Sequence, residues 1–198
     1  SYLQHGDTNI QPNLLMQYLG DNFEAIDFIF DFVKNDRQLS VSYIKELHSL
    51  ITRHQEQTDA IDQLGNHVKI PLLKGQFKIA PNNPVRDDIV YNYCPPEQVV
   101  SEMDNLIEIY NNELAKEHFL VKAAFLHHAF VQIHPFQDGN GRMARLLASF
   151  VLIKEGLFPL SIDRDDRAKY IDALEKADRH EYQDIIDVFA NNQIVSIE

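Results

Sequence analysis

The sequence predicts an all-α fold, a helical bundle of six to eight helices with one small β-hairpin flap. Apolar residues recur with a helical period before residue 52 and again after residue 96. Between these stretches, glycine and proline divide residues 65–96 into short pieces that are typical of strands and turns. Residues 119–133 are apolar almost throughout, which is typical of a buried helix. A bundle that carries a short extended flap satisfies all three observations.

The first helices are predicted from apolar spacing and capping residues. From residue 21 onward, apolar residues follow a 3.6-residue period to Val33, and Asp21 or Asn22 is the candidate N-cap. A second helix should begin after Ser40, whose hydroxyl can accept a hydrogen bond from a free N–H of the first turn. Pro96 should open a third helix, because proline is tolerated in a first turn.

The central helix is expected at residues 119–133, where Lys122 is the single formal charge. A helix that is apolar all round is buried on every side. It should end at His134, because a residue that precedes proline is driven out of the α region. Further helices are expected at residues 141–154, 165–176 and 181–191.

The flap is expected at residues 72–94. Short strand-like pieces, separated by glycine and proline, lie at residues 72–73, 77–79 and 89–93. A two-stranded hairpin is marginal by itself, so the flap should lean on the helices. At 198 residues, the chain suits one domain, residues 21–198, preceded by an N-terminal extension, residues 1–20.

Charge and cysteine content limit the classes of function. The 18 Lys and Arg against 30 Asp and Glu give a formal net charge of −12, which disfavours nucleic acid as a partner because its phosphates would be repelled. No apolar run reaches the roughly 18 residues that a membrane-spanning helix needs, so we expect no membrane partner. Cys94 is the single cysteine, so a disulfide framework is excluded and a reducing compartment, the cytoplasm, is expected.

The most informative stretch is residues 134–145, which read HPFQDGNGRMAR. Gly139 and Gly141 are expected to give the backbone positive φ angles and to omit the Cβ atoms that would block a ligand. Successive N–H groups at the start of the next helix, with the positive end of its dipole, suit phosphate. Arg142 and Arg145, three residues apart, add two guanidinium groups on one side.

Two side chains of this stretch suit metal and proton chemistry. Asp138 supplies a carboxylate beside the cationic loop, so it is a candidate Mg²⁺ ligand shared with substrate phosphates. His134 is a candidate general base near neutral pH. A glycine-rich turn or a single histidine is more often structural. The combination of a base, a carboxylate and two arginines within twelve residues instead favours phosphoryl or nucleotidyl transfer.

The same stretch resembles the motif of the Fic family, H-P-F-x-D/E-G-N-G-R-x-x-R, without a departure. Weaker matches follow in the family's order, from an early helix to the helix after the motif, at residues 44–48, 93–96, 126–128 and 166–174. The resemblance implies the Fic fold and a Mg²⁺-dependent protein adenylyltransferase. Such an enzyme transfers AMP from ATP to a Ser, Thr or Tyr hydroxyl of a target protein and releases pyrophosphate.

The resemblance also implies a role for each motif residue. His134 would deprotonate the target hydroxyl, Asp138 would bind Mg²⁺ between the α- and β-phosphates, and Phe136 would anchor the loop. The phosphates would be held by the remaining loop residues and the two arginines, namely Gly139, Asn140, Gly141, Arg142 and Arg145.

By the same resemblance, the adenine would lie near Tyr170 and Leu174 on the helix after the motif, with Val90 of the flap over it. The family often has asparagine where Asp178 stands here, so this position departs from the pattern of adenine recognition. The target protein is expected to dock on the flap by adding a strand to its edge. A homo-oligomer stays open.

The resemblance bears on regulation as well. The family commonly restrains itself with a helix bearing S/T-x-x-x-E-G/N, whose glutamate pairs with the second motif arginine, here Arg145. The segments that end at Glu46 and Glu56 lack the final glycine or asparagine. We therefore expect an inhibitory helix or a separate antitoxin chain outside these residues, upstream of Ser1 or downstream of Glu198.

Alternative functions stay open. A Fic-type enzyme could transfer UMP or phosphocholine, or remove AMP. An idle Fic fold that only grips a partner is disfavoured by the intact His134, Asp138 and Arg145. His127 and His128 suggest a zinc site, but helix packing is favoured because neither His-Glu-x-x-His nor a cysteine pair is present.

Overall fold

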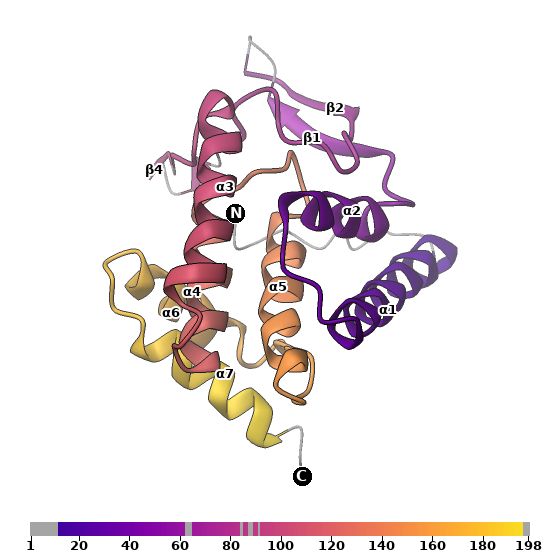
Figure 1. Cartoon of the computed structure of the whole chain (residues 1–198). Helices are drawn as coiled ribbons and strands as arrows, with labels where there is room; N and C mark the ends of the chain where they lie inside the picture. Colours follow the sequence, from indigo (N-terminus) through magenta and orange to yellow (C-terminus); the bar gives the residue numbers. More distant parts are fainter. Residues whose placement is uncertain (1–11, 62–64, 84, 87–88, 91, 196–198) are drawn as a thin grey trace.

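The computed structural model describes residues 12–61, 65–83, 85–86, 89–90 and 92–195, and seven α-helices lie in these ranges (Figure 1). They are α1 (Pro12–Lys34), α2 (Val41–Ile51), α3 (Val99–Glu108), α4 (Phe119–Ile133), α5 (Asn140–Lys154), α6 (Arg167–Ala177) and α7 (Gln183–Val195). A 3₁₀ turn, η1 (Pro96–Gln98), precedes α3, and a π-helical turn, η2 (Ile109–Glu113), follows it. The predicted fold class is confirmed.

The core is built around α4 and α5, which pack against each other at the centre of the molecule (Figure 1). The helices α1 and α2 lie on one side of this pair, and α6 and α7 lie on the other. Most residues of both central helices are buried. Phe130 of α4, Phe150 of α5 and Phe189 of α7 are among the fully buried side chains. The loop between α4 and α5 is therefore held at both ends by the best-packed part of the fold.

The start of the first helix differs from the prediction. Within the described residues α1 begins at Pro12 and not at Asp21. Asp21 lies in the middle of α1 with 0% exposure, and its carboxylate accepts hydrogen bonds from Arg53 (2.7 Å) and His54 (2.9 Å). Asp21 resembles a cap in sequence, but its partners lie more than thirty residues away along the chain. Part of the expected N-terminal extension, residues 1–11, lies outside the described residues.

The other helix boundaries follow the expected signals. The hydroxyl of Ser40 accepts the Tyr43 N–H at 3.3 Å and caps α2, and Pro96 opens the turn before α3. Helix α4 ends where proline requires it, and His134 follows with φ 50° and ψ 56°. The last three helices lie within four residues of their expected bounds. No described helix has both the length and the apolar character needed to cross a membrane.

The strands differ from the prediction in position. The main hairpin pairs β1 (Gln57–Ile61) with β2 (His67–Pro71), antiparallel, with Thr58 opposite Ile70. Two further strands of two residues each, β3 (Val85–Arg86) and β4 (Ile89–Val90), form an antiparallel pair inside the expected flap. The expected pieces at residues 72–73 and 77–79 are not strands.

Gly75 gives the physical reason for this difference. Its φ is 68°, and a Cβ there would lie 2.1 Å from the Ser49 hydroxyl oxygen and 2.9 Å from the Lys45 carbonyl oxygen. The chain therefore turns tightly against α2 at this point and does not continue as a strand.

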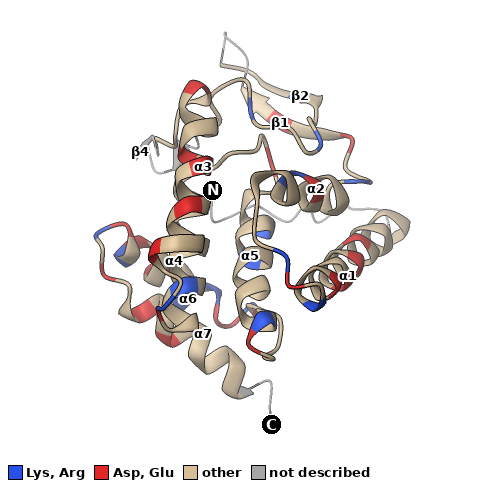
Figure 2. Cartoon of the chain, viewed as in Figure 1, with Lys and Arg blue, Asp and Glu red and all other residues tan. Residues whose placement is uncertain are grey.

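Charge is distributed unevenly over the fold. Acidic side chains follow α1 and α3, whereas basic side chains mark α5 at the centre of the view (Figure 2). The two motif arginines belong to this helix, so the net negative chain keeps a local positive region at the start of α5.

Candidate active site

The loop between α4 and α5 is shaped by two residues with left-handed backbone. His134 has φ 50°, and Gly139, which caps α5, has φ 79°. A Cβ at Gly139 would lie 3.4 Å from both the Arg142 guanidinium and the His48 ring. Gly139 therefore behaves as the sequence predicts. The expected positive φ of Gly141 is wrong, because Gly141 adopts a right-handed helical backbone in the first turn of α5.

Asn140 holds the loop closed from inside. Its amide nitrogen donates to the Phe136 carbonyl oxygen at 2.7 Å, and its amide oxygen accepts the Phe136 N–H at 2.9 Å. Asn140 is 2% exposed. Both polar atoms of the Asn140 side chain are hydrogen-bonded within the loop. A phosphate could therefore bind only to the backbone of Asn140, and the side chain would act by holding the loop in shape.

Phe136 and His48 form the floor of the loop. Phe136 is fully buried, and its ring stacks on that of His48 with centroids 3.7 Å apart. His48 Nε2 bonds to the Asp138 carbonyl oxygen at 3.0 Å, and Nδ1 accepts the Gly75 N–H at 2.9 Å. A carbonyl can only accept and an N–H can only donate, so the imidazole is neutral with its proton on Nε2. Burial lowers the pKa of His48 to about 4.

His134 lies at the opposite end of the loop as a neutral base. It is 9% exposed, and burial, with a contribution from Lys78, holds its pKa well below the ordinary value. Its Nδ1 lies 3.3 Å from the Val131 carbonyl oxygen, which must accept, so the proton sits on Nδ1 and the lone pair on Nε2. The Tyr93 ring stacks on the imidazole with centroids 3.9 Å apart and nearly parallel planes.

Asp138 points toward the turn between α2 and β1. Its Oδ1 accepts the Gly139 N–H at 2.5 Å, and its Oδ2 accepts from the Gln55 amide at 2.5 Å and the Thr58 hydroxyl at 3.2 Å. These three donors are neutral. A carboxylate oriented by neutral donors fits a hard cation such as Mg²⁺ that draws further ligands from substrate phosphates.

The two motif arginines contact different neighbours of α5: Arg142 faces the end of α2, whereas Arg145 lies beside Tyr170 of α6. Arg142 donates to the Ile51 carbonyl oxygen at 3.1 Å and to the Gln55 amide oxygen at 2.5 Å. Its buried Nε has no hydrogen-bond partner among the described residues. Arg145 lies beside Gly141, where a Cβ would be 3.7 Å from a guanidinium nitrogen. An anion at this helix start would meet two guanidinium groups.

The residues expected around the adenine are not brought to an open surface. Leu174 is fully buried and Tyr170 is 4% exposed, with its hydroxyl 2.8 Å from His127 Nε2. Both belong to the core between α4 and α6. The backbone of Val90 lies in β4, and its side chain is outside the described residues.

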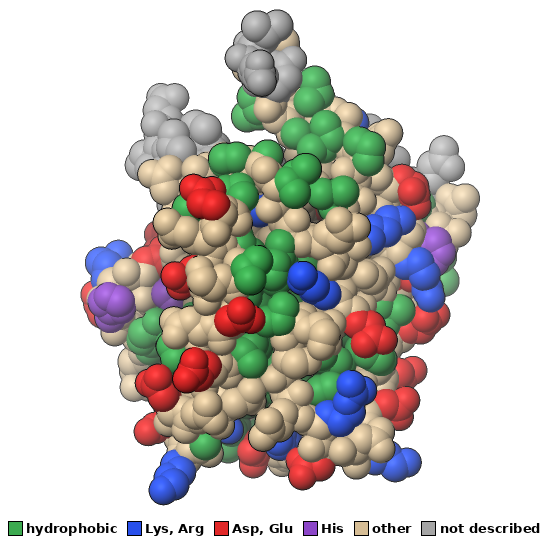
Figure 3. Space-filling view, turned by 45° about the horizontal axis from the view of Figure 1, so that its top comes forward, with side chains coloured by type: hydrophobic (Ala, Val, Ile, Leu, Met, Phe, Trp, Pro, Cys, Tyr) green, Lys and Arg blue, Asp and Glu red, His purple; other side chains and the backbone are tan. Residues whose placement is uncertain are grey.

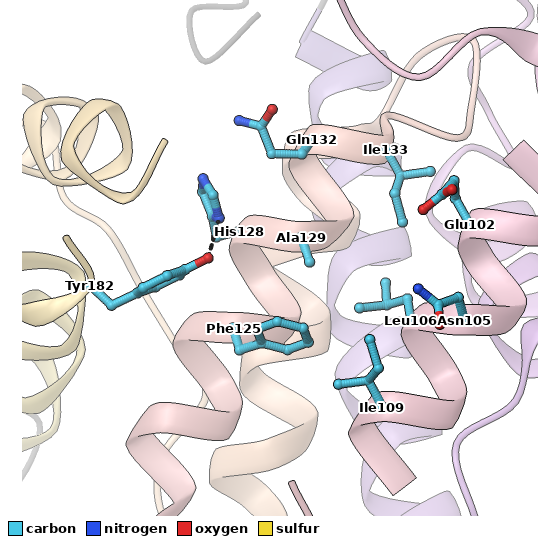
Figure 4. Close-up of a pocket in the computed structure, with 10 residues that line it drawn as sticks. All are labelled: Glu102, Asn105, Leu106, Ile109, Phe125, His128, Ala129, Gln132, Ile133 and Tyr182. Atoms are coloured by element: carbon cyan, nitrogen blue, oxygen red, sulfur yellow. Dashed lines mark hydrogen bonds between the residues drawn. The ribbon is translucent and has the colours of Figure 1, made fainter. Parts of the chain in front are cut away.

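A hollow of about 260 Å³ lies on the outer face of α4, toward α3 (Figure 4). Its wall is apolar, formed by Leu106, Ile109, Phe125, Ala129 and Ile133. His128, Gln132 and Tyr182 add polar groups. Asp178 accepts from both His128 (2.8 Å) and Gln132, so the position that departs from the family pattern is tied to this rim.

The structure favours packing over zinc binding at the two adjacent histidines. His127 is fully buried against Tyr170, and His128 bonds to Tyr182 (3.1 Å) and Asp178. Among the described residues, no group of three or more His, Cys, Asp or Glu side chains could hold a metal ion.

Four residues of the site were not predicted from the sequence. His48 and Tyr93 lie in segments that resemble the family, but no chemistry was assigned to them. Gln55 and Thr58 carry no sequence signal, because each reaches Asp138 from more than seventy residues away.

Comparison with known proteins now decides the family. The family model described as "Fic/DOC family" matches residues 38–152, more than half of the chain. This chain belongs to the Fic/DOC family. It is 44% identical over 91 residues to a Fido domain-containing protein of Dictyostelium discoideum, covering 44% of this chain and 63% of that protein. It is 26% identical over 155 residues to the protein adenylyltransferase fic-1 of Caenorhabditis elegans, covering 76% of this chain and 30% of that enzyme.

Solved structures agree with the fold. A Fic domain containing signaling protein from Bacteroides thetaiotaomicron superposes with a TM-score of 0.77 at 25% identity, covering 91% of this chain and 69% of that chain. Two structures at 18% identity support the fold alone: BepC of Bartonella tribocorum with bound AMPPNP (TM-score 0.54, 96% and 94% covered) and IbpAFic2 in complex with adenylylated Cdc42 (TM-score 0.60, 98% and 60% covered). The chain spans less than two thirds of the curated relatives described above.

Proposed function

We propose that this chain is a protein adenylyltransferase that moves AMP from ATP to a Ser, Thr or Tyr hydroxyl of a target protein. The observation that carries the proposal is His134, a neutral imidazole held at one end of a loop whose other end is a cationic helix start. The family, and the relatives named protein adenylyltransferase, support the same activity.

The base step follows from the tautomer of His134. Nδ1–H donates to Val131, so Nε2 is the atom that accepts the proton of the target hydroxyl. The oxygen of the target then forms a bond to the α-phosphorus, and the bond from that phosphorus to the pyrophosphate oxygen breaks. The imidazolium passes its proton to solvent. Because burial lowers the pKa of His134, the imidazole is unprotonated at neutral pH before the reaction begins.

The phosphates of ATP are assigned to the start of α5. The backbone turns at Gly139 so that the first N–H groups of the helix are available to an anion. The guanidinium groups of Arg142 and Arg145 add positive charge there. Asp138 would hold Mg²⁺, which supplies charge neutralisation of the phosphates when bound.

The adenine is assigned to the hollow on α4. Its apolar wall suits a flat aromatic base, and the Asp178 carboxylate beside the rim can accept a hydrogen bond from an amino group. This replaces the expectation that the base lies directly on Tyr170 and Leu174, which are buried.

The target protein is assigned to the flap, where strand addition to the β3–β4 pair would supply backbone hydrogen bonds. Apolar side chains gather at the top of the molecule in the space-filling view (Figure 3). Ile61 and Ile79 are 56% and 78% exposed. We also propose that the protein acts in the cytoplasm and that its inhibitory element lies outside these residues. A homo-oligomer is a further possibility within this proposal.

Labelling with radioactive nucleotides tests the proposal. The purified protein is incubated with Mg²⁺ and ATP labelled at the α-phosphate, and auto-modification is followed by gel and mass spectrometry. Parallel reactions use ATP labelled at the γ-phosphate, UTP and CDP-choline. We expect label from α-labelled ATP alone. Label from UTP or CDP-choline would favour transfer of another group, and loss of AMP from a modified acceptor would favour removal.

A further inference from the structure

One side chain joins the proposed metal ligand to the proposed phosphate ligand. The Gln55 amide nitrogen donates to Asp138 Oδ2 and its amide oxygen accepts from Arg142, both at 2.5 Å. Gln55 lies outside the motif, in the turn between α2 and β1. It therefore contacts both of the charges that the proposed function needs.

The chemistry of an amide suits this position. Asp138 can only accept and an arginine can only donate, so the side chain between them must do both. Glutamine does so in one orientation and carries no charge. A glutamate would bond to Arg142 but repel Asp138, and a lysine would do the reverse.

We propose that Gln55 is a positioning residue that orients Asp138 and Arg142 without neutralising either charge. This inference rests on the proposed function, because it assigns Asp138 to the metal and Arg142 to the phosphates. Because the amide is neutral, the bridge itself adds no charge that would compete with Mg²⁺ at Asp138 or with the nucleotide at Arg142.

The turn that carries Gln55 is fixed from the opposite side. The two residues before it, Arg53 and His54, both bond to the buried carboxylate of Asp21 in α1. The residue after Gln55, Glu56, pairs with Lys74 at 2.8 Å.

Thr58, the buried residue of β1, is a second neutral donor to Asp138 Oδ2, at 3.2 Å.

Two variants test the bridge and its neighbour. Gln55→Glu places a negative charge against both Arg142 and Asp138 and removes the amide donor to Asp138, whereas Thr58→Val removes only the separate hydroxyl donor to Asp138 and leaves the bridge in place. Gln57→Glu makes the same charge change on an exposed side chain two residues away and is the matched control. The dissociation constant of a non-hydrolysable ATP analogue is measured by calorimetry with and without Mg²⁺, together with the melting temperature.

We expect Gln55→Glu to weaken analogue binding without Mg²⁺ by about tenfold or more, since the new carboxylate takes up the charge of Arg142. Thr58→Val should leave Mg²⁺-free binding as in wild type and reduce the gain in affinity on adding Mg²⁺ by roughly threefold or more. Thr58→Ser, which keeps the hydroxyl, should restore the gain. Gln57→Glu should bind as wild type.

Other outcomes overturn the inference. If Gln55→Glu binds the analogue as wild type does, Gln55 does not orient Arg142 toward the nucleotide. If Thr58→Val loses the same affinity with and without Mg²⁺, the Thr58 hydroxyl is only structural. If Gln55→Glu does not fold, Gln55→Ala is measured in its place, and wild-type binding by that variant with and without Mg²⁺ would overturn the inference. Failure of the wild-type protein to bind the analogue would overturn the proposed function, and this inference with it.

Discussion

The motif loop and the β1–β2 hairpin meet at Asp138, yet they are stabilised in different ways. The loop is anchored in the core, with Phe136 fully buried and Asn140 2% exposed. In the hairpin, β1 buries Thr58 as its one buried residue, and no residue of β2 is buried. The groups proposed to react are thus held by the core, whereas the residues proposed to orient Asp138 come from the turn and strand beside it, which are mostly exposed.

The proposed base lies in the loop, so the largest effect is expected there. His134→Ala should reduce AMP transfer roughly 10²–10⁴-fold, because the target hydroxyl loses its base. Analogue binding should stay near the wild-type value, since His134 is assigned to the proton and not to the phosphates. Transfer is measured by labelling and binding by calorimetry on the same preparation. Near-wild-type transfer by the variant would exclude His134 as the base.

Substitutions in the two regions should also differ in their effect on the free energy of unfolding. Phe136→Ala removes a fully buried ring that stacks on His48, so the free energy of unfolding should fall by about 3–5 kcal/mol. Ile61→Ala, at the exposed end of β1, should change it by less than about 0.5 kcal/mol. Denaturant unfolding of both variants gives the comparison. Similar losses would show that the hairpin belongs to the cooperative core.

His48 joins the loop to α2 and makes this contact sensitive to acid. Its pKa is about 4 in the folded chain against an ordinary 6.5, so the unfolded state binds more protons between these values. His48 alone should therefore lower the free energy of unfolding by roughly 3 kcal/mol as the pH drops from 6.5 to 4.

Substitution isolates this contribution. His127, whose pKa is lowered to about 3 by burial, acts in the same direction and remains in the variant. His48→Asn should thus give a shallower fall of unfolding free energy between pH 6.5 and 4 than wild type. Denaturant titrations at half-unit pH steps measure the slopes. Equal slopes in both proteins would place the proton uptake elsewhere.

The sequence predicted the loop better than its surroundings for physical reasons. The end of α4 and the turn at Gly139 depend on local backbone preferences, which Pro135 and glycine express directly. The hairpin at residues 57–71 alternates weakly and is polar, so it has little pattern to detect. Its contacts with Asp138 depend on tertiary placement, which spacing along the chain cannot show.

Two other differences between the predicted and the observed structure also arise from tertiary contacts. Asp21 has the chemistry of an N-cap, but the hydrogen bonds of its buried carboxylate with Arg53 and His54 override the local signal. Tyr170 and Leu174 lie on the expected helix, yet their side chains face the core. In both cases the residue type was informative, and the direction of the side chain was decided by distant partners.

A smaller effect, confined to one activity, is expected in the flap. Val90 lies in β4, opposite Val85, and proline there removes a backbone donor from an edge that the target would pair with. Val90→Pro should lower transfer to a protein target about tenfold while analogue binding stays at the wild-type value. Equal losses of transfer and binding would mean that the flap is structural or serves the nucleotide only.

The smallest effect is expected from the two glutamates that resemble the family's inhibitory signal. Glu56 is exposed and pairs with Lys74, so it does not occupy Arg145. Glu46 lies on α2 in a segment that lacks the final glycine or asparagine of the signal. Glu46→Gly and Glu56→Gly should therefore leave auto-labelling unchanged within about twofold, since exposed pairs contribute little. Melting temperatures of both variants control for helix weakening. A several-fold rise from either variant without added partner would show that the chain carries its own inhibitor after all.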